Sequence, residues 1–410
     1  MSFASARSLV LNSNSKEQLT ASDEPVACTK SSFPTSTKGN THTQSLRSEV
    51  FKTIQAILLA LCFIASTICL HFQQWLGGPI YLLNRKCFYA WQAVVKESTA
   101  LLLISLNQWI APCSAKISGD ASVRGQIRKT SSGWVHLDFP DRLVLIANHQ
   151  IYTDWLFLWW SAYTTHHHGH LFIVLKDSLK NIPVLGPGMM FFSWVFLSRR
   201  WEADRPRFEH RMSHLSNPSL QQAMWLLIFP EGTNLSGNTR GMSEKWASKM
   251  NIHDLKHVLL PRTRGLQFCL EALNPTVKWV YDCTIAYEGI PPGEFGQDIY
   301  SLHNLYIKSH DAPVTHIHWR RFDVANIPLS DSKAFDQWLY KRWAEKDELL
   351  EHFQQHNCFP ADEGYVEAQI KLNNSLEILQ IMASALAVVL VWWLVKTITQ
   401  SFTAFPLLDM

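Results

Sequence analysis

The chain has 410 residues, a formal net charge of +3 and 17% charged residues. A nucleic-acid-binding surface needs clustered Lys and Arg, so this balance excludes nucleic acid as the partner class. The length allows a core of catalytic size with appendages, and the 17 Trp and 22 Phe fit either a large core or a membrane interface.

The chain begins with a polar tail followed by an apolar segment. Residues 1–46 are rich in Ser, Thr, Asn and Gln, which bury too little apolar surface to offset the entropy of ordering, so we predict disorder. The run IQAILLALCFIASTICL then begins at Ile54, too far from the start for a signal peptide. It carries no charge and is just long enough to span hydrocarbon, which predicts a transmembrane helix over 54–72, with a buried core helix as the alternative. A shorter run over 98–111 contains polar residues and predicts an interfacial or core helix.

Short apolar runs alternate with longer stretches through the middle of the chain. Runs of this length predict strands, and the stretches between most of them have room for helices, which favours an α/β fold over an all-β fold. The predicted strands lie at 143–147, 171–176, 194–198, 225–229, 258–260, 280–287 and 315–324.

Two more helices are predicted towards the C-terminus. Over 332–353, apolar residues recur every three to four positions, which predicts an amphipathic helix whose apolar stripe packs on the core. The run ILQIMASALAVVLVWWLV at 378–395 contains two adjacent Trp with Lys396 just beyond, the pattern of an interfacial anchor. It predicts a second transmembrane helix.

The strand at 143–147 is followed directly by NHQIYTDW, which pairs a histidine with an acid five residues later. His149 can act as a general base on a hydroxyl if Asp154 holds its other ring nitrogen and stabilises the imidazolium. Positions five apart lie about 140° out of phase on one helix. The pair therefore meets only if His149 sits in a strand-to-helix turn and Asp154 in the first helical turn; for these two residues alone, a polar turn with a capping Asp is the alternative.

A second polar loop follows the predicted strand at 225–229. PEGTN places a lone acid, Glu231, at a strand end, and Gly232 allows a ligand to approach the backbone closely. Open α/β sheets place their ligand sites at the carboxyl ends of strands, so two such ends with unusual polar residues favour a functional site.

Two arginines are candidates for binding a phosphate bidentately. Arg199 directly follows the apolar run WVFLS, and Arg262 follows LLP at another predicted strand end. The alternative for the arginine-rich segment after WVFLS is a solvated, mixed-charge helix start.

The cluster HHHGH at 166–170 is predicted to be an exposed loop and not a metal site. Imidazoles this close in sequence seldom converge on one ion. The eight Cys contain no C-x-x-C pair, which predicts free thiols in a reducing compartment. We therefore expect neither a metal site nor a disulfide framework.

These segments together resemble the glycerophosphate and lysophospholipid acyltransferases. NHQIYTDW is similar to the NHxxxxD motif of that family, WVFLSRRW to its second motif and FPEGT to its third. LLPRTRG and YDCTIAYEG resemble the subgroup that contains lysocardiolipin and lysophosphatidylinositol acyltransferases and their fungal relatives. The ordered matches predict an acyltransferase domain at 85–325, followed by a C-terminal helical extension at 326–374. The resemblance implies a mixed sheet flanked by helices and docked on the bilayer.

The resemblance also implies an activity, the transfer of an acyl group from acyl-CoA to a lysophospholipid hydroxyl. Acyl-CoA would be a co-substrate, and no cofactor is expected. By this resemblance, His149 would deprotonate the hydroxyl and Asp154 would orient His149. The residues implied on the acceptor side are Arg199, Glu231, Gly232, Thr233, Asn234 and Arg262.

Asn234 departs from a common pattern of the family. Many members that acylate lysophosphatidic acid have Arg after EGT, and Asn cannot replace its charge-assisted grip on a dianionic phosphomonoester. This favours an acceptor with a phosphodiester headgroup, such as lysophosphatidylinositol or lysocardiolipin. Lysophosphatidic acid is the alternative, because Arg199, Arg200 or Arg262 would compensate.

Asn234-Leu235-Ser236 is also an N-glycosylation sequon, and a glycan there would crowd the predicted site. We therefore expect the catalytic domain to face the cytosol, where acyl-CoA is available. We also expect the protein to be integral to the membrane of the endoplasmic reticulum. Two other classes stay open: a non-catalytic membrane scaffold that binds lipid, and a membrane hydrolase that uses the same dyad on water.

Overall fold

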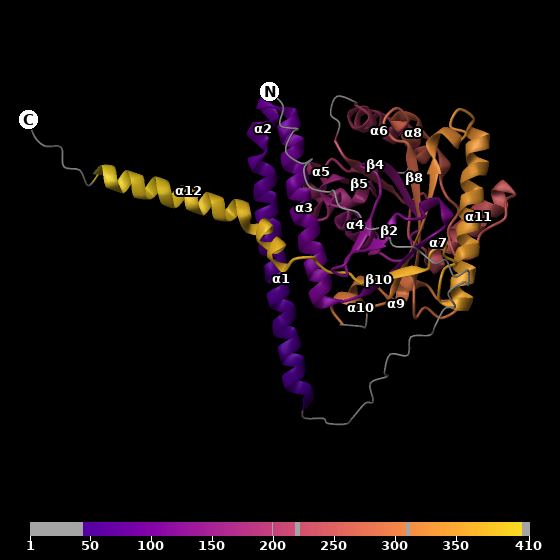
Figure 1. Cartoon of the computed structure of the whole chain (residues 1–410), viewed down its shortest axis with the longest axis horizontal. Coiled ribbons are helices and arrows are strands. Elements are labelled where there is room, and N and C mark those ends of the chain that lie inside the picture. Colours follow the sequence, from indigo (N-terminus) through magenta and orange to yellow (C-terminus); the bar gives the residue numbers. More distant parts are fainter. Residues whose placement is uncertain (1–43, 199, 218–221, 309–311, 404–410) are drawn as a thin grey trace, which may run out of the picture. The chain divides into compact units, whose positions relative to one another are not determined.

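The computed structural model describes residues 44–198, 200–217, 222–308 and 312–403, and its centre is an eight-stranded sheet (Figure 1). In spatial order the strands are β10 (Tyr365–Gln369), β1 (Ser114–Gly119), β9 (Thr315–Asp323), β8 (Trp279–Tyr287), β4 (Arg142–Ala147), β7 (Met224–Ile228), β5 (Leu171–Lys176) and β6 (Val195–Leu197). A separate two-stranded sheet joins β2 (Ile127–Lys129) to β3 (Val135–Leu137). Of the tail predicted to be disordered, residues 1–43 lie outside the described part, whereas residues 44–46 form the start of α1, so the prediction is wrong for them.

The sheet is mixed, as the family resemblance implies. β4 lies parallel to β7 and β8, and β5 lies parallel to β7 and β6. β9 runs antiparallel to β8 and parallel to β1, and β10 runs antiparallel to β1. Ile146 pairs with Ile228, so the carboxyl ends of β4 and β7 lie side by side. The loops that follow these two strands therefore meet at one edge of the sheet.

Helices cover both faces of this sheet. The α-helices are α1 (Gln44–Leu76), α2 (Gly78–Leu83), α3 (Arg85–Ile110), α4 (Asp154–Thr164), α5 (Leu185–Phe191), α6 (Trp201–Leu215), α7 (Gly237–Met250), α8 (Thr263–Leu273), α9 (Gly296–Ile299), α10 (Leu302–Tyr306), α11 (Ser332–His356) and α12 (Leu379–Thr403). The 3-10 turns are η1 (Ala121–Val123), η2 (His168–His170), η3 (Asp177–Asn181), η4 (Val324–Asn326) and η5 (Ser375–Ile378).

The side chains of β4 divide the core between the two faces. Leu143 and Leu145 pack in the cluster that includes α3 and α4. Val144 and Ile146 pack in the cluster that includes α6, α8 and α11. A strand buried on both faces needs apolar residues at every position, which is why LVLIA is continuous and not alternating.

Most of the predicted strands are confirmed, and one is wrong. Six of the predicted runs correspond to β4, β5, β6, β7, β8 and β9. The run at 258–260 forms no strand; its Leu259 backbone N–H donates instead to the Glu231 side chain. β1 and the edge strand β10 were not predicted from the sequence, and β10 places part of the expected extension at 326–374 inside the sheet.

The prediction of an exposed loop at 166–170 is wrong for most of the segment, since only His166 is exposed. His168 is 8% exposed, and its carbonyl accepts a hydrogen bond of 2.8 Å from the Trp159 indole N–H. Gly169 lies against α3, where a Cβ would come 2.6 Å from Glu97 Cγ. His168 and Gly169 are buried because α3 and α4 pack against this turn.

The apolar helices differ in how they relate to the core. Figure 1 shows α1 and α3 side by side, and α1 also contacts α12. Within the described residues, the helical segment 57–83 is the one long and apolar enough to cross a membrane. The predicted helix at 98–111 is the end of α3, and Leu101, Leu102 and Ile104 are buried there, so it is a core helix. The segment 378–395 is helical within η5 and α12.

Candidate active site

The turn between β4 and α4 brings His149 and Asp154 together. β4 ends at Ala147 and α4 begins at Asp154, so the histidine lies in a strand-to-helix turn. His149 Nδ1 is 2.7 Å from Asp154 Oδ2. The Asp154 side chain is fully buried, whereas the imidazole is 17% exposed. A buried acid thus holds a ring that still reaches the surface.

Asp154 is held in place by four donors. Besides the imidazole, Oδ2 accepts backbone N–H groups from Gln150 at 2.6 Å and Ile151 at 3.0 Å. The other oxygen, Oδ1, accepts a hydrogen bond from the Tyr287 hydroxyl. The acid also lies in the first turn of α4, where the helix dipole favours negative charge. These contacts stabilise the carboxylate and fix its orientation towards the ring.

Tyr287 and Asn148 also contribute to this site, although the sequence did not identify them as functional candidates. Burial raises the pKa of Tyr287 well above its ordinary value, which keeps the phenol protonated and therefore a donor to Asp154. The Asn148 side chain pairs with the backbone of Ile285, donating at 2.9 Å and accepting at 2.8 Å, and so extends the pairing of β4 with β8. The role of Tyr287 could not be recognised from YDCTIAYEG, because a tyrosine at this position is also typical of an ordinary buried strand.

The remaining ring nitrogen of His149 is the one available for chemistry. The ring stacks on Phe229 with centroids 4.4 Å apart and an interplanar angle of 24°. With Nδ1–H donated to the carboxylate, Nε2 carries the lone pair. Within the described part of the chain, Nε2 has no hydrogen-bond partner. The arrangement can accept a proton from a substrate hydroxyl placed there.

Glu231 connects three segments of the site. It is 3% exposed, and Oε1 accepts the His149 backbone N–H at 3.3 Å and the Trp343 indole N–H at 3.4 Å. Oε2 accepts the Leu259 backbone N–H at 3.3 Å. Burial raises the pKa of Glu231 to about 8, against the opposing effect of these donors. The Glu231 side chain therefore connects the loop that carries His149 to the loop at Leu259 and to Trp343 on α11.

Gly232 and Arg262 lie next to each other, directly after Glu231 in the loop and at the start of α8. Gly232 has φ +73°, and a Cβ there would come 3.4 Å from Arg262 Nε. The Arg262 backbone N–H donates to the Pro230 carbonyl at 2.8 Å, and its side chain is exposed. A positive φ disfavours any L side chain, so glycine keeps this approach open.

The end of the PEGTN loop is tied to the histidine. The Leu235 backbone N–H donates to the His149 carbonyl at 2.8 Å. Thr233 and Asn234 precede it and are half-buried. The structure thus brings together His149, Asp154, Glu231 and the loop that carries Thr233 and Asn234. Arg199 lies outside the described residues.

The chain matches the acyltransferase family model over residues 131–266 and the acyltransferase C-terminus model over 308–392. It is 32% identical to an acyltransferase of Schizosaccharomyces pombe, over 79% of this chain and 91% of that protein. It is 33% identical to the 2-acyl-1-lysophosphatidylinositol acyltransferase of Saccharomyces cerevisiae, over 78% of this chain and 89% of that protein. It is also 33% identical to lysocardiolipin acyltransferase 1 of Danio rerio, over 67% of this chain and 65% of that protein.

Proposed function

The chain belongs to the acyltransferase family, and we propose that this O-acyltransferase transfers an acyl group from acyl-CoA to the hydroxyl of a lysophospholipid. The observation that carries the proposal is the His149–Asp154 pair, with one ring nitrogen bound to a buried carboxylate and the other open. The names of the relatives in yeast and zebrafish support a lysophospholipid as the acceptor class.

The proposed reaction is a direct transfer. His149 Nε2 takes the proton of the acceptor hydroxyl as its oxygen attacks the thioester carbonyl, and Asp154 stabilises the imidazolium that forms. The tetrahedral intermediate collapses by breaking the C–S bond, and the proton passes from His149 to the departing CoA thiolate. A thioester is already activated, so this route needs neither a covalent acyl-enzyme nor a metal or other cofactor.

The acceptor we propose carries a phosphodiester headgroup, as in lysophosphatidylinositol or lysocardiolipin. Asn234 supplies no charge for a dianionic phosphomonoester. On the acceptor side we place Gly232, Thr233, Asn234, Arg262 and Arg199, with Glu231 shaping the loop from within. The alternative acceptor is lysophosphatidic acid, and the exposed guanidinium of Arg262 next to Gly232 is the feature that favours it.

The dyad is tested with purified protein, labelled acyl-CoA and a panel of lysolipids. We expect wild type to form phospholipid and His149→Ala to lose about 10²–10⁴-fold in rate, the usual contribution of a general base. Equal rates in the two proteins would remove the dyad assignment. Free fatty acid as the sole product would identify a hydrolase, and no reaction with any acceptor would favour a lipid-binding scaffold.

The headgroup argument is tested by running the same panel with Asn234→Arg. The new guanidinium should shift preference towards lysophosphatidic acid relative to phosphodiester acceptors. Asn234→Gln is the matched control, because it lengthens the side chain without adding charge. An unchanged acceptor profile in the Arg variant would refute the phosphate argument.

We propose that the protein is integral to the endoplasmic reticulum membrane, spanning it with the apolar part of α1 and with α12, and that the domain faces the cytosol. The helical segment 57–83 supports the first span, and the two Trp before Lys396 support the second. Alkaline extraction of membranes should leave the native protein in the pellet. A glycan on Asn234 of the native protein would contradict the cytosolic placement.

A further inference from the structure

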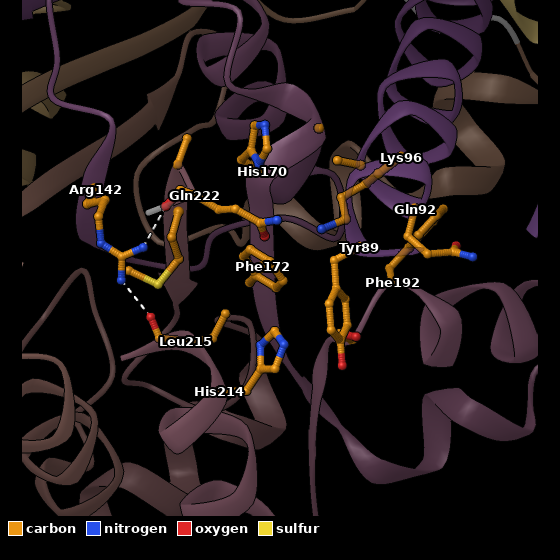
Figure 2. A pocket seen from close by; sticks show the side chains of 15 residues that line it. Tyr89, Gln92, Lys96, Arg142, His170, Phe172, Phe192, His214, Leu215 and Gln222 are labelled. Carbon is orange, nitrogen blue, oxygen red and sulfur yellow. Dashed lines mark hydrogen bonds between the residues drawn. The ribbon is translucent and has the colours of Figure 1, made fainter. Parts of the chain in front are cut away.

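A pocket lies at the ends of the strands opposite to the dyad (Figure 2). Arg142 and Met224 line it, and they are the first residues of β4 and β7, whose carboxyl ends carry the active-site loops. Tyr89 and Lys96 on α3 and His214 on α6 also line it. The pocket is therefore separated from the dyad by the length of the central strands.

Lys96 is a buried lysine whose side-chain nitrogen lies over an aromatic ring. It is 2% exposed, and its Nζ lies 3.8 Å from the centre of the Phe172 ring. Figure 2 shows the side chain reaching from α3 towards Phe172 and the pocket. In the described part of the chain, no carboxylate pairs with this ammonium and no Asp or Glu lines the pocket. Burying a charge costs free energy unless it is paired, so a bound anion would stabilise the protonated form of Lys96.

The other ionisable groups at the pocket add positive character. Arg211 lies close enough to lower the pKa of Lys96, although burial contributes more, and together they bring it to about 7. Among the described residues, Arg142 donates to neutral acceptors, which include the carbonyls of Gln222 and Leu215, both at 2.6 Å. The acid adjacent to Lys96 in sequence, Glu97, reaches Gln380 on α12 instead. The pocket is electrostatically suited to an anion.

The pocket also lies close in sequence to the proposed membrane span. α3 begins two residues after the apolar helical segment 57–83 ends. Tyr89, Gln92 and Lys96 recur every three to four positions and so share one face of α3. Basic pockets next to membrane helices are suited to lipid headgroups.

We propose that this pocket binds a phosphate group through the Lys96 ammonium, as a second site distinct from the acceptor site. Because it follows the span on α3, the phosphodiester of an anionic phospholipid is the expected source, and free inorganic phosphate is the other. Placing the span in a bilayer is part of the proposed function, but the pocket binds phosphate whether or not the dyad transfers acyl groups.

The test uses full-length protein in nanodiscs of phosphatidylcholine, with or without a minor fraction of phosphatidylglycerol, and measures the unfolding midpoint. A third arm adds inorganic phosphate to the phosphatidylcholine discs. Lys96→Met keeps the length and apolar body of the side chain but removes the charge. Lys278→Met is the matched control, since Lys278 also lies over a ring, 5.2 Å from the Trp279 centroid, but is exposed. Lys96→Gln serves as a second variant if Lys96→Met does not fold.

A ligand that binds only the folded state raises the unfolding midpoint. We expect phosphatidylglycerol to raise it in wild type and in Lys278→Met, and to leave it unchanged in Lys96→Met. If inorganic phosphate alone raises the midpoint and this rise requires Lys96, the site binds phosphate, but its ligand is free phosphate and not a lipid headgroup. No rise in either arm, or an equal rise in Lys96→Met, would overturn the proposal. Acyl transfer, assayed separately, reports on the dyad and so distinguishes failure of the two proposals.

The lipid effect should also depend on pH. A phosphodiester does not titrate near neutrality, whereas Lys96, with a pKa of about 7, must be protonated to bind it. Burial lowers the pKa of His170 to about 4, so that ring stays neutral in this range; burial also lowers the pKa of His214 and raises that of Tyr89, which disfavours the charged form of both. The rise in midpoint should therefore be larger at about pH 6 than at about pH 8.5. An equal rise at both values would contradict the role of Lys96.

Discussion

Tyr287 links a buried strand to the dyad, and its hydroxyl can be removed without changing its shape. Tyr287→Phe deletes the hydrogen bond to Asp154 Oδ1 and leaves the other three donors. Hydrogen bonds to charged groups contribute about 1.5–3 kcal/mol, so we expect kcat to fall about 10- to 100-fold with little change in KM. Steady-state kinetics over a range of pH measures this. A carboxylate with fewer donors attracts the imidazolium more strongly, so the acidic limb of the profile should move to higher pH.

The control for this variant is Tyr281→Phe on the same strand. The Tyr281 hydroxyl donates to Gln126 Oε1 at 2.8 Å, away from the dyad. If both variants lose activity equally, Tyr287 does not position the dyad. The same conclusion follows if Tyr287→Phe lowers the stability of the protein but keeps the pH profile of wild type, because Tyr287 would then act only in packing.

Glu231 gives a residue-scale prediction about pH and stability. Its pKa is raised from 4.5 to about 8 by burial, so between these values the folded state holds a proton that the unfolded state releases. Stability from this group is present at low pH and is lost as pH rises towards 8, by up to about 1.4 kcal/mol per unit. Glu231→Gln cannot titrate, so the stability difference between wild type and this variant should change between about pH 5 and 8. Denaturant unfolding checks this, and a constant difference would show that burial does not protonate the acid.

At the scale of elements, α11 is anchored to the sheet by a buried ion cluster. Lys346 Nζ donates to Asp282 Oδ1 at 2.6 Å and to the Cys283 carbonyl at 2.7 Å. Arg320 Nη2 donates to the other oxygen of Asp282 at 2.6 Å, and Nη1 to Glu345 at 2.8 Å. The Lys346 and Asp282 side chains are fully buried. The cluster ties α11 to both β8 and β9, and the same helix carries the Trp343 that contacts Glu231.

Lys346→Met breaks this cluster on one side. Removing one partner of a buried pair leaves an incompletely compensated charge, which costs about 3–5 kcal/mol. We expect a loss of this size in the free energy of unfolding, measured by chemical denaturation of the purified protein. Lys341→Met changes an exposed lysine on the same helix and should be nearly neutral. A loss below about 1 kcal/mol for Lys346→Met would mean that the apolar packing of α11 suffices to hold it.

The central strands were predictable because burial on both faces demands unbroken apolar runs, as in β4 and β7. β1 and β10 were not, since SAKISG and YVEAQ mix polar with apolar residues and gain their partners only from distant parts of the chain. The run at 258–260 was mistaken for a strand because Val258 and Leu259 are buried in a loop. His149 and Asp154 were found from local spacing, whereas Tyr287 meets them only through strand pairing.

At the scale of the whole molecule, buried histidines predict sensitivity to acid. Burial lowers the pKa of His168 and His318 to about 3 and that of His170 to about 4. These imidazoles stay neutral in the folded state while the unfolded state binds protons below about pH 6.5. Their contribution is fully present above that pH and is lost as pH falls, by up to about 1.4 kcal/mol per unit for each. Three imidazoles outweigh the opposite effect of Glu231, so the free energy of unfolding should fall as pH drops below about 6.5.

The measurement is the denaturant midpoint as a function of pH. Below about pH 6.5, His318→Gln should make the free energy of unfolding depend less steeply on pH, because one fewer proton is bound on unfolding. His253→Gln changes an exposed histidine and should leave this dependence unchanged. A flat profile between about pH 6.5 and 4.5 would contradict the burial of these rings.

The position of β1 also bears on how the protein is made. This strand is synthesised before any other in the sheet, yet its two neighbours are residues 315–323 and 365–369. While the ribosome is still translating the intervening residues, the edge of β1 has no native partner, and by then the apolar segment at 57–83 has already emerged. The sheet therefore keeps β1 unpaired during most of synthesis, and it is completed only when nearly the whole chain has left the ribosome.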